Sequence, residues 1–513
     1  ANGGEEGGLH SDHILDILVA PDERVFIATT TGLSIYEKGV MKPAPPFKKP
    51  NAGLSMVLSV VAEPDGTILA GTLSGIERLR DGEFFPEFES LQDEKTSLSV
   101  QTMMRDRWGT LWVGTQRGLR NVQGDHVHDS AAYSALATGE MVMDILEDHE
   151  GGIWVAVRNV GLMRLMPNWR NFSVLRKGNA AQGGLISDGM TDSYPDSKGG
   201  LWLVHREGGL EHVSVDGKIQ RFFDTPETRF PWGQLSSVLA GADGKVWIGH
   251  PRGISLADPS TGKATHWLAT DENSTLPRGM VRLLRQEKDG TLWMSIYGSG
   301  IQTRDLNGNV LNTWLAGKEG GLPQGSVEDM QFGPDGRMWV AGDFGVMRHD
   351  AEKGFVRVTD ETLGRVMGMA FSPEGELWTA RLGYFDHFNV VDGRLERLDT
   401  VSKAEGLPAV DVGGMVVDHS GDVWATSIRG LWRFRPETRE LRRFGVSDGL
   451  PSDEFSILPP LISPSGVIVG STAKGVVLFD PRLINNQKTA PRLVLDELSV
   501  LTSDGRSVLD PEM

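Results

Sequence analysis

Apolar and polar residues alternate in short runs along most of the chain, and a tight-turn signal separates neighbouring runs. The stretch DRWGTLWVGTQRGLRNV, residues 106–122, contains an Asp/Gly turn, an apolar run with Trp112, a glycine and another apolar run. Alternation with a period of two residues predicts half-buried β-strands. Asp and Gly tolerate the backbone angles of tight hairpin turns, so we expect consecutive runs to pair as antiparallel strands.

This unit recurs eleven times along the chain. Aligned on the position of Trp112, the copies centre on Phe26, Leu69, Trp112, Trp154, Trp202, Trp247, Trp293, Trp339, Trp378, Trp424 and Val469. Neighbouring centres lie 39 to 48 residues apart. Each unit holds three such runs and a looser fourth one, and four antiparallel strands in about 45 residues are typical of a β-propeller blade. A solenoid of parallel coils is the alternative, but its coils need only about 20–30 residues and do not use hairpin turns.

The count of copies predicts an all-β fold of tandem β-propellers with four-stranded antiparallel blades. Eleven blades exceed the roughly 4–8 of one ring, so two rings are expected. The longest spacing, between Trp154 and Trp202, contains a Gly-rich stretch that begins at Arg176. This favours four blades in residues 1–183 and seven in residues 184–487. A division into seven and four near Gly317, or into five and six, stays open.

Charge and composition narrow the classes of function. The chain has 51 Lys and Arg residues against 69 Asp and Glu, a net charge of -18, and no cysteine. Such acidity argues against nucleic-acid binding through bulk charge, and the lack of thiols excludes disulfides and thiolate metal sites. No apolar run reaches the roughly 18 residues of a membrane span. The chain begins at Ala1 and stops in mid-pattern at LDPEM, and we expect it to be a processed or trimmed part of a longer protein.

The recurring order of Asp, Gly, Leu-Trp-Val, Gly-Thr and Gly-Leu closely resembles the two-component regulator propeller repeat. The stretches SDGLPSDEF (447–455), EGLPAVDV (405–412) and GGLPQGSV (320–327) resemble that family's connection into the next blade. The stretch APRLVLDELSVLTSDGRSV (490–508) resembles the first strands of the Ig-like β-sandwich that follows those propellers, which implies the start of such a domain in residues 488–513. The resemblance covers residues 9–508. Many members of the family resemble two rings of seven blades, and this chain departs from them with eleven copies.

The resemblance also implies a location and a function. In that family the propellers form the periplasmic sensor of an inner-membrane protein, the cytoplasmic output is a histidine kinase or a diguanylate cyclase, and ligands are often glycan fragments. It therefore implies a ligand-sensing region that is not itself an enzyme. Pairing of two copies is compatible with this function, and the membrane would be reached only through a segment outside this chain.

Candidate binding residues lie in the turn between the second and third strands of each unit. On a propeller these turns share one face of the disc with the connections that enter the next blade. Basic and aromatic residues occupy them: Arg117, Arg158, His205, Arg206, His250, Arg252, Tyr297, Phe344, Arg381, Arg429 and Lys474. Guanidinium groups bind carboxylate, sulfate or phosphate in a bidentate manner, and a ring of them focuses the electrostatic field over a concave mouth. Trp232, in a connection on the same face, has an indole that can stack on a pyranose. The alternative is that these Arg residues occupy the hairpin turns because their side chains are well solvated, and that they pair with nearby Asp residues.

Catalysis is the competing class of function. No nucleophile elbow, phosphate-binding glycine loop or metal-ligand run is present, so we predict no catalytic residue, metal or cofactor. Calcium binding at the turns DHEGG or DSKGG is an alternative, although neither turn has the series of ligand residues found in a calcium-binding loop. The repeated Trp residues are expected to pack between neighbouring blades. A secreted or periplasmic lyase or glycosidase, with His205 and His250 as candidate bases, and a protein-interaction scaffold stay open as alternatives.

Overall fold

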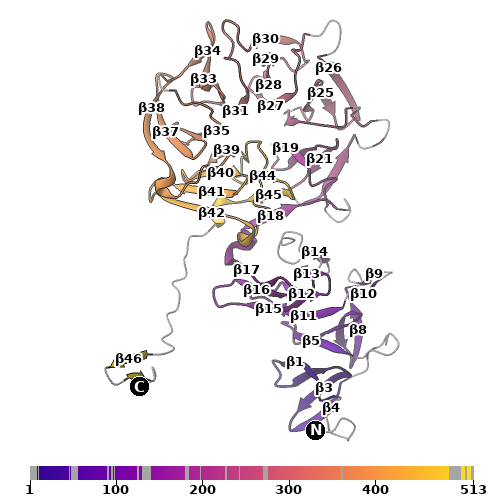
Figure 1. Cartoon of the computed structure of the whole chain (residues 1–513). Helices are drawn as coiled ribbons and strands as arrows, with labels where there is room; N and C mark the ends of the chain where they lie inside the picture. Colours follow the sequence, from indigo (N-terminus) through magenta and orange to yellow (C-terminus); the bar gives the residue numbers. More distant parts are fainter. Residues whose placement is uncertain are drawn as a thin grey trace. The chain divides into compact units, whose positions relative to one another are not determined.

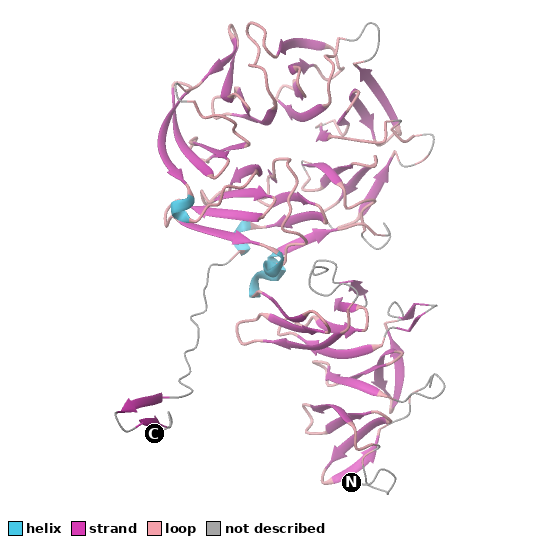
Figure 2. Ribbon diagram, viewed as in Figure 1, coloured by secondary structure: helices cyan, strands magenta, loops and turns pink. Residues whose placement is uncertain are grey.

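The computed structural model describes residue 9 and residues 11–509, apart from residues 45–46, 48–55, 89–91, 94–95, 98, 124–125, 130–139, 179–183, 197, 216, 224, 226–227, 231, 242, 270–274, 360–361, 485–497 and 503–504. It divides into two compact units, residues 1–483 and residues 484–513. The first unit contains eleven antiparallel sheets of the predicted kind, ten with four strands and one with three (Figures 1 and 2). The predicted all-β fold of repeated four-stranded blades is confirmed.

The first four sheets, which we call the four-sheet segment, follow one another along the chain. Their strands are β1 (Ile14–Val19), β2 (Val25–Thr29), β3 (Gly32–Glu37) and β4 (Val40–Pro43); β5 (Val57–Ala62), β6 (Ile68–Thr72), β7 (Gly75–Arg80) and β8 (Glu83–Glu87); β11 (Val100–Arg105), β12 (Leu111–Thr115), β13 (Gly118–Gln123) and β14 (His126–Asp129); and β15 (Val142–Glu147), β16 (Ile153–Val157) and β17 (Gly161–Leu165). A short hairpin, β9 (Gln92–Asp93) with β10 (Thr96–Ser97), lies between the second and third sheets in the sequence.

The remaining seven sheets form a closed ring. Their strands are β19 (Met190–Pro195), β20 (Leu201–His205), β21 (Leu210–Val213) and β22 (Ile219–Phe222); β23 (Ser237–Ala240), β24 (Val246–His250), β25 (Gly253–Asp258) and β26 (Lys263–Leu268); β27 (Val281–Gln286), β28 (Leu292–Ile296), β29 (Gly300–Arg304) and β30 (Val310–Leu315); β31 (Val327–Phe332), β32 (Met338–Gly342), β33 (Gly345–Asp350) and β34 (Gly354–Arg357); β35 (Gly368–Phe371), β36 (Leu377–Arg381), β37 (Tyr384–Val391) and β38 (Arg394–Val401); β39 (Val412–Val417), β40 (Val423–Ser427), β41 (Gly430–Arg435) and β42 (Glu440–Phe444); and β43 (Leu461–Ile462), β44 (Ile468–Thr472) and β45 (Gly475–Phe479), which are joined by β18 (Phe172–Leu175).

The pairing of β18 with β45 closes this seven-sheet ring. Phe172 lies opposite Phe479 and Leu175 opposite Val476, so a strand from upstream of the ring's first sheet forms the outer strand of its last sheet. The Ser471 hydroxyl also donates to the carbonyl of Met190 in the first sheet, at 3.2 Å. From the sequence, residues 1–183 are expected to belong to the first group of blades. The pairing places β18 in the ring instead, because it supplies the fourth strand of the sheet formed by β43, β44 and β45.

The helical content of the described residues is limited to short 3-10 turns. These are η3 (Pro167–Asn171), η5 (Lys403–Glu405), η6 (Val446–Asp448) and η7 (Pro481–Leu483). Within the described part of the chain, we find no helix whose length and apolar character suit a membrane crossing. In the second unit, β46 (Leu498–Thr502) pairs with β47 (Gly505–Leu509) as an antiparallel hairpin. The start of an Ig-like domain in residues 488–513 stays a prediction.

The hydrophobic core is distributed between neighbouring sheets rather than within each sheet. Trp112 of the third sheet packs with Val142 and Ile145 of the fourth. In the ring, Trp247 packs with Leu284 of the following sheet. The repeated Trp residues are buried or half-buried, which confirms the expected packing role. A sheet of this kind has two apolar faces and cannot cover them alone, so each blade depends on its neighbours.

Three of the repeated Trp residues also bond to an Asp in the hairpin turn of their own sheet. The indole nitrogen of Trp112 donates to Asp106 at 3.0 Å, that of Trp154 to Asp148 at 2.8 Å, and that of Trp424 to Asp418 at 2.8 Å. The Asp lies six residues before the Trp in each case, a spacing present in the sequence. The same carboxylate accepts backbone N–H groups within the turn, so it fixes both the turn and the ring.

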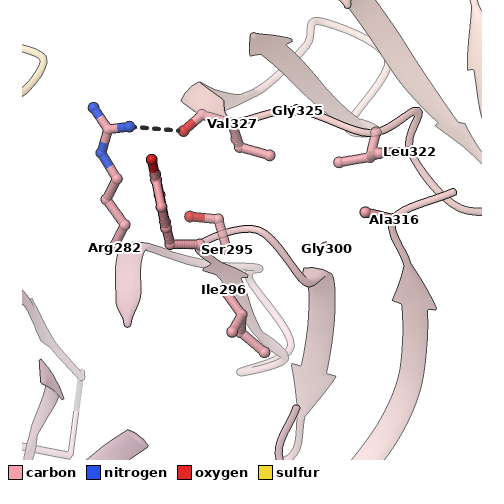
Figure 3. Close-up of a pocket in the computed structure, with 9 residues that line it drawn as sticks. Arg282, Ser295, Ile296, Gly300, Ala316, Leu322, Gly325 and Val327 are labelled. Atoms are coloured by element: carbon pink, nitrogen blue, oxygen red, sulfur yellow. Dashed lines mark hydrogen bonds between the residues drawn. The ribbon is translucent and has the colours of Figure 1, made fainter. Parts of the chain in front are cut away.

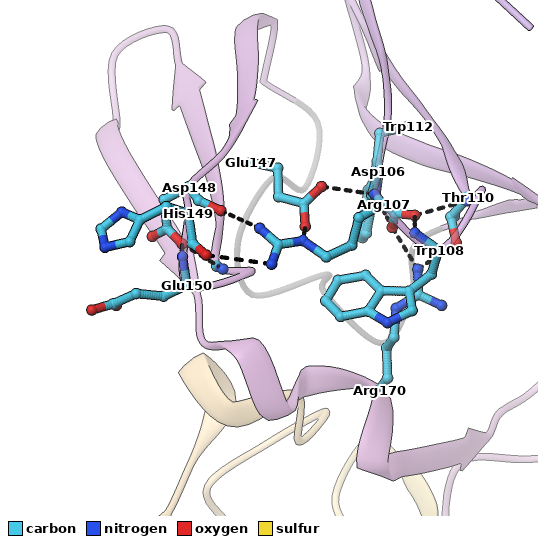
Figure 4. A network of polar contacts seen from close by, with 11 residues as sticks. Asp106, Arg107, Trp108, Thr110, Trp112, Glu147, Asp148, His149, Glu150 and Arg170 are labelled. Atoms are coloured by element: carbon cyan, nitrogen blue, oxygen red, sulfur yellow. Dashed lines mark hydrogen bonds and ion pairs between the residues drawn. The ribbon is translucent and has the colours of Figure 1, made fainter. Parts of the chain in front are cut away.

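The segment between β17 and β18 contacts both groups of sheets. Trp169 of η3 meets Trp112 edge to face, with ring centroids 5.0 Å apart. Arg170 pairs with Asp106 at 2.5 Å and stacks on Trp108 (Figure 4). The backbone N–H of Met166 donates to the carbonyl of Ser447 in the ring at 2.7 Å. Figure 4 also shows Arg107, which pairs with Glu147 and so connects the third and fourth sheets.

Carboxylates on the innermost strands join neighbouring sheets by hydrogen bonds. Asp192 of β19 accepts the N–H of Val238 in β23 at 2.9 Å, and Asp329 of β31 accepts that of Met369 in β35 at 3.1 Å. Asp329 is buried, and Asp192 is half-buried. Burial raises the pKa of Asp192 to about 7, although its backbone hydrogen bonds and Arg285 act in the opposite direction.

Replacing a repeated Trp should destabilise the ring. Trp424 has no exposed surface and contacts Phe444 and Phe479, so we expect Trp424→Ala to cost about 3–5 kcal/mol in free energy of unfolding. The melting midpoint measured by near-UV circular dichroism should fall by roughly 6–15 °C. Val215→Ala, at a 75% exposed residue of the same ring, is the control and should leave the midpoint unchanged. Equal midpoints for the two variants would contradict the packing role.

The Asp192 carboxyl should make stability depend on pH. The pKa of Asp192 is about 7 in the folded protein and about 3.8 in the unfolded chain. Between these two pH values the folded state keeps a proton that the unfolded chain has lost. The resulting stability is complete below about pH 4 and is lost as the pH rises through about 7. We therefore expect the melting midpoint of Asp192→Asn to fall less than that of the parent chain between about pH 5 and pH 8. Asp16→Asn, at the same strand position in the first sheet, is the control, and a slope for Asp192→Asn equal to that of the parent would refute this assignment.

Candidate ligand-binding face

The turns between the second and third strands share one face with the segments that lead into the innermost strands. Backbone hydrogen bonds place them together: the N–H of Arg206 donates to the carbonyl of Gly189 at 2.9 Å, and that of Tyr297 to Met280 at 2.9 Å. The N–H of Asp343 donates to Ser326 at 3.2 Å in the same way. We call this surface of the seven-sheet ring the turn face.

Four of the predicted residues come together where the first two sheets of the ring meet. Trp232, in the connection between β22 and β23, stacks on the imidazole of His250 with ring centroids 4.0 Å apart and planes 8° apart. Arg252 follows in the turn after β24, and Arg206 lies in the turn after β20. The turn that holds Arg206 also contacts the Trp232 connection. The two backbones are so close that a Cβ atom on Gly208 would lie 2.5 Å from the carbonyl oxygen of Gly233.

His250 is held in place beneath Trp232. Its Nε2 shares a hydrogen bond with the hydroxyl of Ser255 at 3.1 Å, and the same hydroxyl meets Nδ1 of His266 at 2.8 Å. Burial lowers the pKa of His250 to about 4, and the neighbouring His266 contributes in the same direction. The imidazole is therefore neutral at neutral pH and acts as a flat support for the half-buried indole.

Three predicted site residues lie below the surface. His205 and His250 have no exposed area, and Phe344 is 9% exposed and belongs to the core between two sheets. His205 bonds through Nε2 to Glu211 at 2.7 Å, and Glu211 also binds Arg221 at 2.9 Å. The expectation that these side chains meet a ligand directly is not met in this structure, because each ends a buried second strand or packs under its turn.

The predicted Arg residues differ in their surroundings. Arg206, Arg252 and Arg429 are exposed in turns of the ring, as is Lys474. Arg381 is half-buried. Its guanidinium donates two hydrogen bonds to the carboxylate of the buried Asp386, at 2.5 and 3.0 Å. It thus follows the alternative in which an Arg at a hairpin pairs with a nearby Asp.

Two further predicted residues, Arg117 and Arg158, do not belong to this surface. They are exposed in the corresponding turns of the third and fourth sheets, which lie in the four-sheet segment. The predicted set of ligand-binding residues is therefore divided between the ring and a separate group of blades.

An ion-pair chain on the turn face was not anticipated from the sequence. Arg282 of β27 pairs with Glu328 of β31 at 2.7 Å, and Glu328 also pairs with Arg365 at 3.0 Å. Arg282 further donates to the carbonyl of Val327 at 3.2 Å (Figure 3). Arg282 and Glu328 each occupy the second position of an innermost strand, where a β-bulge breaks the pairing register. The break of alternation in VRLLRQ and VEDMQF was the signal that could have indicated them.

A small hollow lies beside these ion pairs, with Arg282 in its lining. It is lined by Arg282, Ser295, Ile296, Tyr297, Gly300, Ala316, Leu322, Gly325 and Val327 (Figure 3). Its volume of about 10 Å³ is close to the least that holds one water molecule. It is too small for a sugar ring, so the turn face offers an open surface rather than a deep pocket here. Tyr297, 55% exposed, forms part of its rim.

Comparisons with solved structures identify the fold. The extracellular domain of a protein described as the hybrid two-component system BT3049 of B. thetaiotaomicron superposes with a TM-score of 0.65, at 18% identity, over 99% of this chain and 68% of that one. This chain has the fold of that extracellular domain. The corresponding domain of BT4673 from the same organism gives a TM-score of 0.51 at 17% identity over 92% of this chain.

The likeness is one of backbone arrangement. The chain spans 68% of the BT3049 domain and 65% of the BT4673 domain. No family model matches the sequence, and no curated protein sequence matches it either. At 17–18% identity the fold is shared while the turn residues are free to differ, so the binding chemistry of this chain has to be argued from its own side chains.

Proposed function

We propose that this chain is the extracytoplasmic, ligand-sensing part of a membrane-bound signalling protein. We further propose that a small anionic ligand, an acidic oligosaccharide, binds on the turn face around Trp232. The observation that carries the proposal is the gathering of Trp232, Arg206 and Arg252 where two sheets of the ring meet. The sensing role is supported by the fold shared with extracellular domains of two-component systems.

The aromatic part of this site suits a sugar ring. An indole offers a flat apolar face to the C–H groups of a pyranose. The indole of Trp232 is already held by protein contacts. It stacks on His250 and meets His266 edge to face, with ring centroids 4.8 Å apart. A side chain that is held before binding loses less conformational entropy when a ligand arrives.

The basic part suits a carboxylate or sulfate on that sugar. Arg206 and Arg252 are exposed in the turns after β20 and β24, the second strands of two neighbouring sheets. A guanidinium fork binds such groups through two parallel hydrogen bonds. In a protein of net charge -18, exposed guanidinium groups give an anionic ligand a local electrostatic attraction.

A lyase or glycosidase receives less support. His205 and His250, the candidate bases, have no exposed surface, and their Nε2 atoms already bond to Glu211 and Ser255. A general base has to come within hydrogen-bond reach of the substrate. The signalling output, the pairing of two copies and the part played by Arg429 stay predictions.

Calorimetric titration tests the proposed site. We expect oligogalacturonate to bind the chain and neutral cello-oligosaccharides to bind more weakly, with an affinity for the acidic ligand that falls as salt is raised. Arg206→Ala combined with Arg252→Ala should weaken binding by at least about 10- to 100-fold, since even one hydrogen bond to a charged group contributes about 1.5–3 kcal/mol. Trp232→Ala should weaken it as well.

The matched control lies at the opposite end of the same sheet. Lys245 is an exposed cation in the turn between β23 and β24, so Lys245→Ala removes one positive charge away from the turn face. Its affinity should equal that of the parent chain. Unchanged binding by the double Arg variant, or an equal loss with Lys245→Ala, would rule out a site at Trp232. Release of shortened or unsaturated sugars during the titration would favour the enzyme instead.

A further inference from the structure

A second exposed aromatic residue lies on the turn face, one sheet beyond the Trp232 site. Tyr297, in the turn after β28, is 55% exposed. Two other aromatic residues near such turns are already in use. Phe344 packs in the core, and the guanidinium of Arg381 covers the ring of Tyr384, 4.8 Å from its centroid. Tyr297 therefore keeps an aromatic surface that a ligand can reach.

An exposed arginine stands next to the Tyr297 turn. Arg278 belongs to the connection between β26 and β27. Its carbonyl accepts the hydroxyl of Ser299, which follows Tyr297 in the same turn, at 2.5 Å. A Cβ atom on Gly279 would lie 2.5 Å from the carbonyl oxygen of Tyr297. The end of the connection therefore rests directly against the turn.

The backbone around Arg278 is fixed before any ligand arrives. Leu276 is 4% exposed and belongs to the core between the second and third sheets of the ring. The carbonyl of Thr275 accepts a hydrogen bond from the amide of Gln302 at 2.8 Å, and that of Met280 accepts the N–H of Tyr297 at 2.9 Å. A residue carried on such a backbone loses less conformational entropy on binding.

The same connection also reaches the Trp232 site. At its start, the N–H of Ala269 donates to the carbonyl of Arg252 at 2.9 Å. A Cβ atom on Gly253 would lie 3.0 Å from the side chain of Leu276. The connection thus contacts the Arg252 turn as well as the Tyr297 turn, and the two turns belong to neighbouring sheets.

The arginines of this part of the turn face are not neutralised by ion pairs. Within the described residues, none of three exposed arginines forms an ion pair with a carboxylate: Arg206, Arg252 and Arg278. In the next sheet the arrangement differs, because Glu328 pairs with Arg365 at 3.0 Å and Arg365 also pairs with Asp343 at 3.5 Å. The three guanidinium groups are therefore available for the carboxylates or sulfates of a ligand.

We propose that Arg278 and Tyr297 form a second subsite for the ligand that binds at Trp232, and that this ligand is a linear acidic oligosaccharide long enough to occupy both subsites. The inference rests on the proposed function, since it extends that site along the turn face. Trp232 and Tyr297 each stack on a sugar ring, and the arginines bind acidic groups on successive rings.

The two subsites together select for the length of the ligand. Once a sugar chain is bound at Trp232, its contact with Tyr297 is an intramolecular event, and the affinity rises without any further loss of translational freedom. A sugar too short to reach both subsites gains nothing from the second one. Loss of the second subsite therefore affects long ligands and spares short ones.

Calorimetric titration with digalacturonate and hexagalacturonate tests the second subsite. The parent chain should bind the hexamer at least about 10 times more tightly than the dimer. Arg278→Ala combined with Tyr297→Ala should weaken binding of the hexamer by about 10-fold or more and leave binding of the dimer unchanged. Tyr297→Phe keeps the aromatic ring and should bind the hexamer as the parent chain does.

The matched control lies at the opposite end of the same sheet. Lys288 is exposed in the turn between β27 and β28, so Lys288→Ala removes a positive charge away from the turn face. Its affinity for the hexamer should equal that of the parent chain. An equal loss with Lys288→Ala would show a general effect of charge and overturn the second subsite.

The outcomes separate this inference from the proposed function. If Trp232→Ala weakens binding of both oligomers while the double variant at Arg278 and Tyr297 binds the hexamer normally, the first site stands and the second subsite is wrong. If Trp232→Ala changes neither affinity, the proposed function itself fails. A hexaglutamate peptide that binds as tightly as hexagalacturonate would also overturn the inference, because it carries the charges without the sugar rings.

Discussion

Contact between neighbouring sheets is the constraint on which the rest of this structure depends. Each four-stranded sheet has an apolar surface on both sides and no core of its own, so its stability comes from the sheets before and after it. Trp112 and Trp247 fill these contacts, and side chains such as Asp192 add hydrogen bonds between innermost strands. In the seven-sheet ring every sheet has two neighbours, and β18 completes the last one.

This constraint also explains where variation is tolerated. The strands supply most of the inter-sheet contacts. Among residues in the turns between second and third strands, Phe344 joins this core, whereas Arg206 and Arg252 are exposed. Arg206 and Arg252 therefore extend into water without weakening a core contact. Trp232 is an intermediate case, because its connection is folded back onto the end of β24 and its ring rests on His250. A ligand site made of such residues is held by the scaffold but does not share its packing requirements.

The segment around η3 connects the two groups of sheets through several kinds of contact. Trp169 belongs to the core between the third and fourth sheets, and the N–H of Met166 bonds to Ser447 of the ring. Ser447 lies in the connection between β42 and β43, and the N–H of Phe455 in that connection donates to Ser427 at 3.1 Å. Ser427 ends β40, next to the exposed turn that holds Arg429. The turn face and the four-sheet segment are therefore joined by a short path of packed and hydrogen-bonded residues.

The repeat itself could be derived from the sequence. The alternation of apolar residues, the Asp/Gly turns and the spacing of residues such as Trp112 and Trp154 determine the strands and their antiparallel order, because a hairpin is a local structure. The burial of the Trp residues follows from their equivalent positions. The Asp six residues before a Trp was also visible in the sequence, although its bond to the indole was not predicted.

Contacts between distant residues were decided by the tertiary structure alone. No local pattern marks Phe172–Leu175 as the partner of β45, since the two strands lie about 300 residues apart in the sequence and pair only when the ring closes. The same holds for His205 and His250. They resemble surface residues by their place before a turn, yet they are buried by Glu211 in one case and by Trp232 in the other. A sequence determines which side chains each blade carries, but whether a side chain faces water depends on which other blade or connection lies against it.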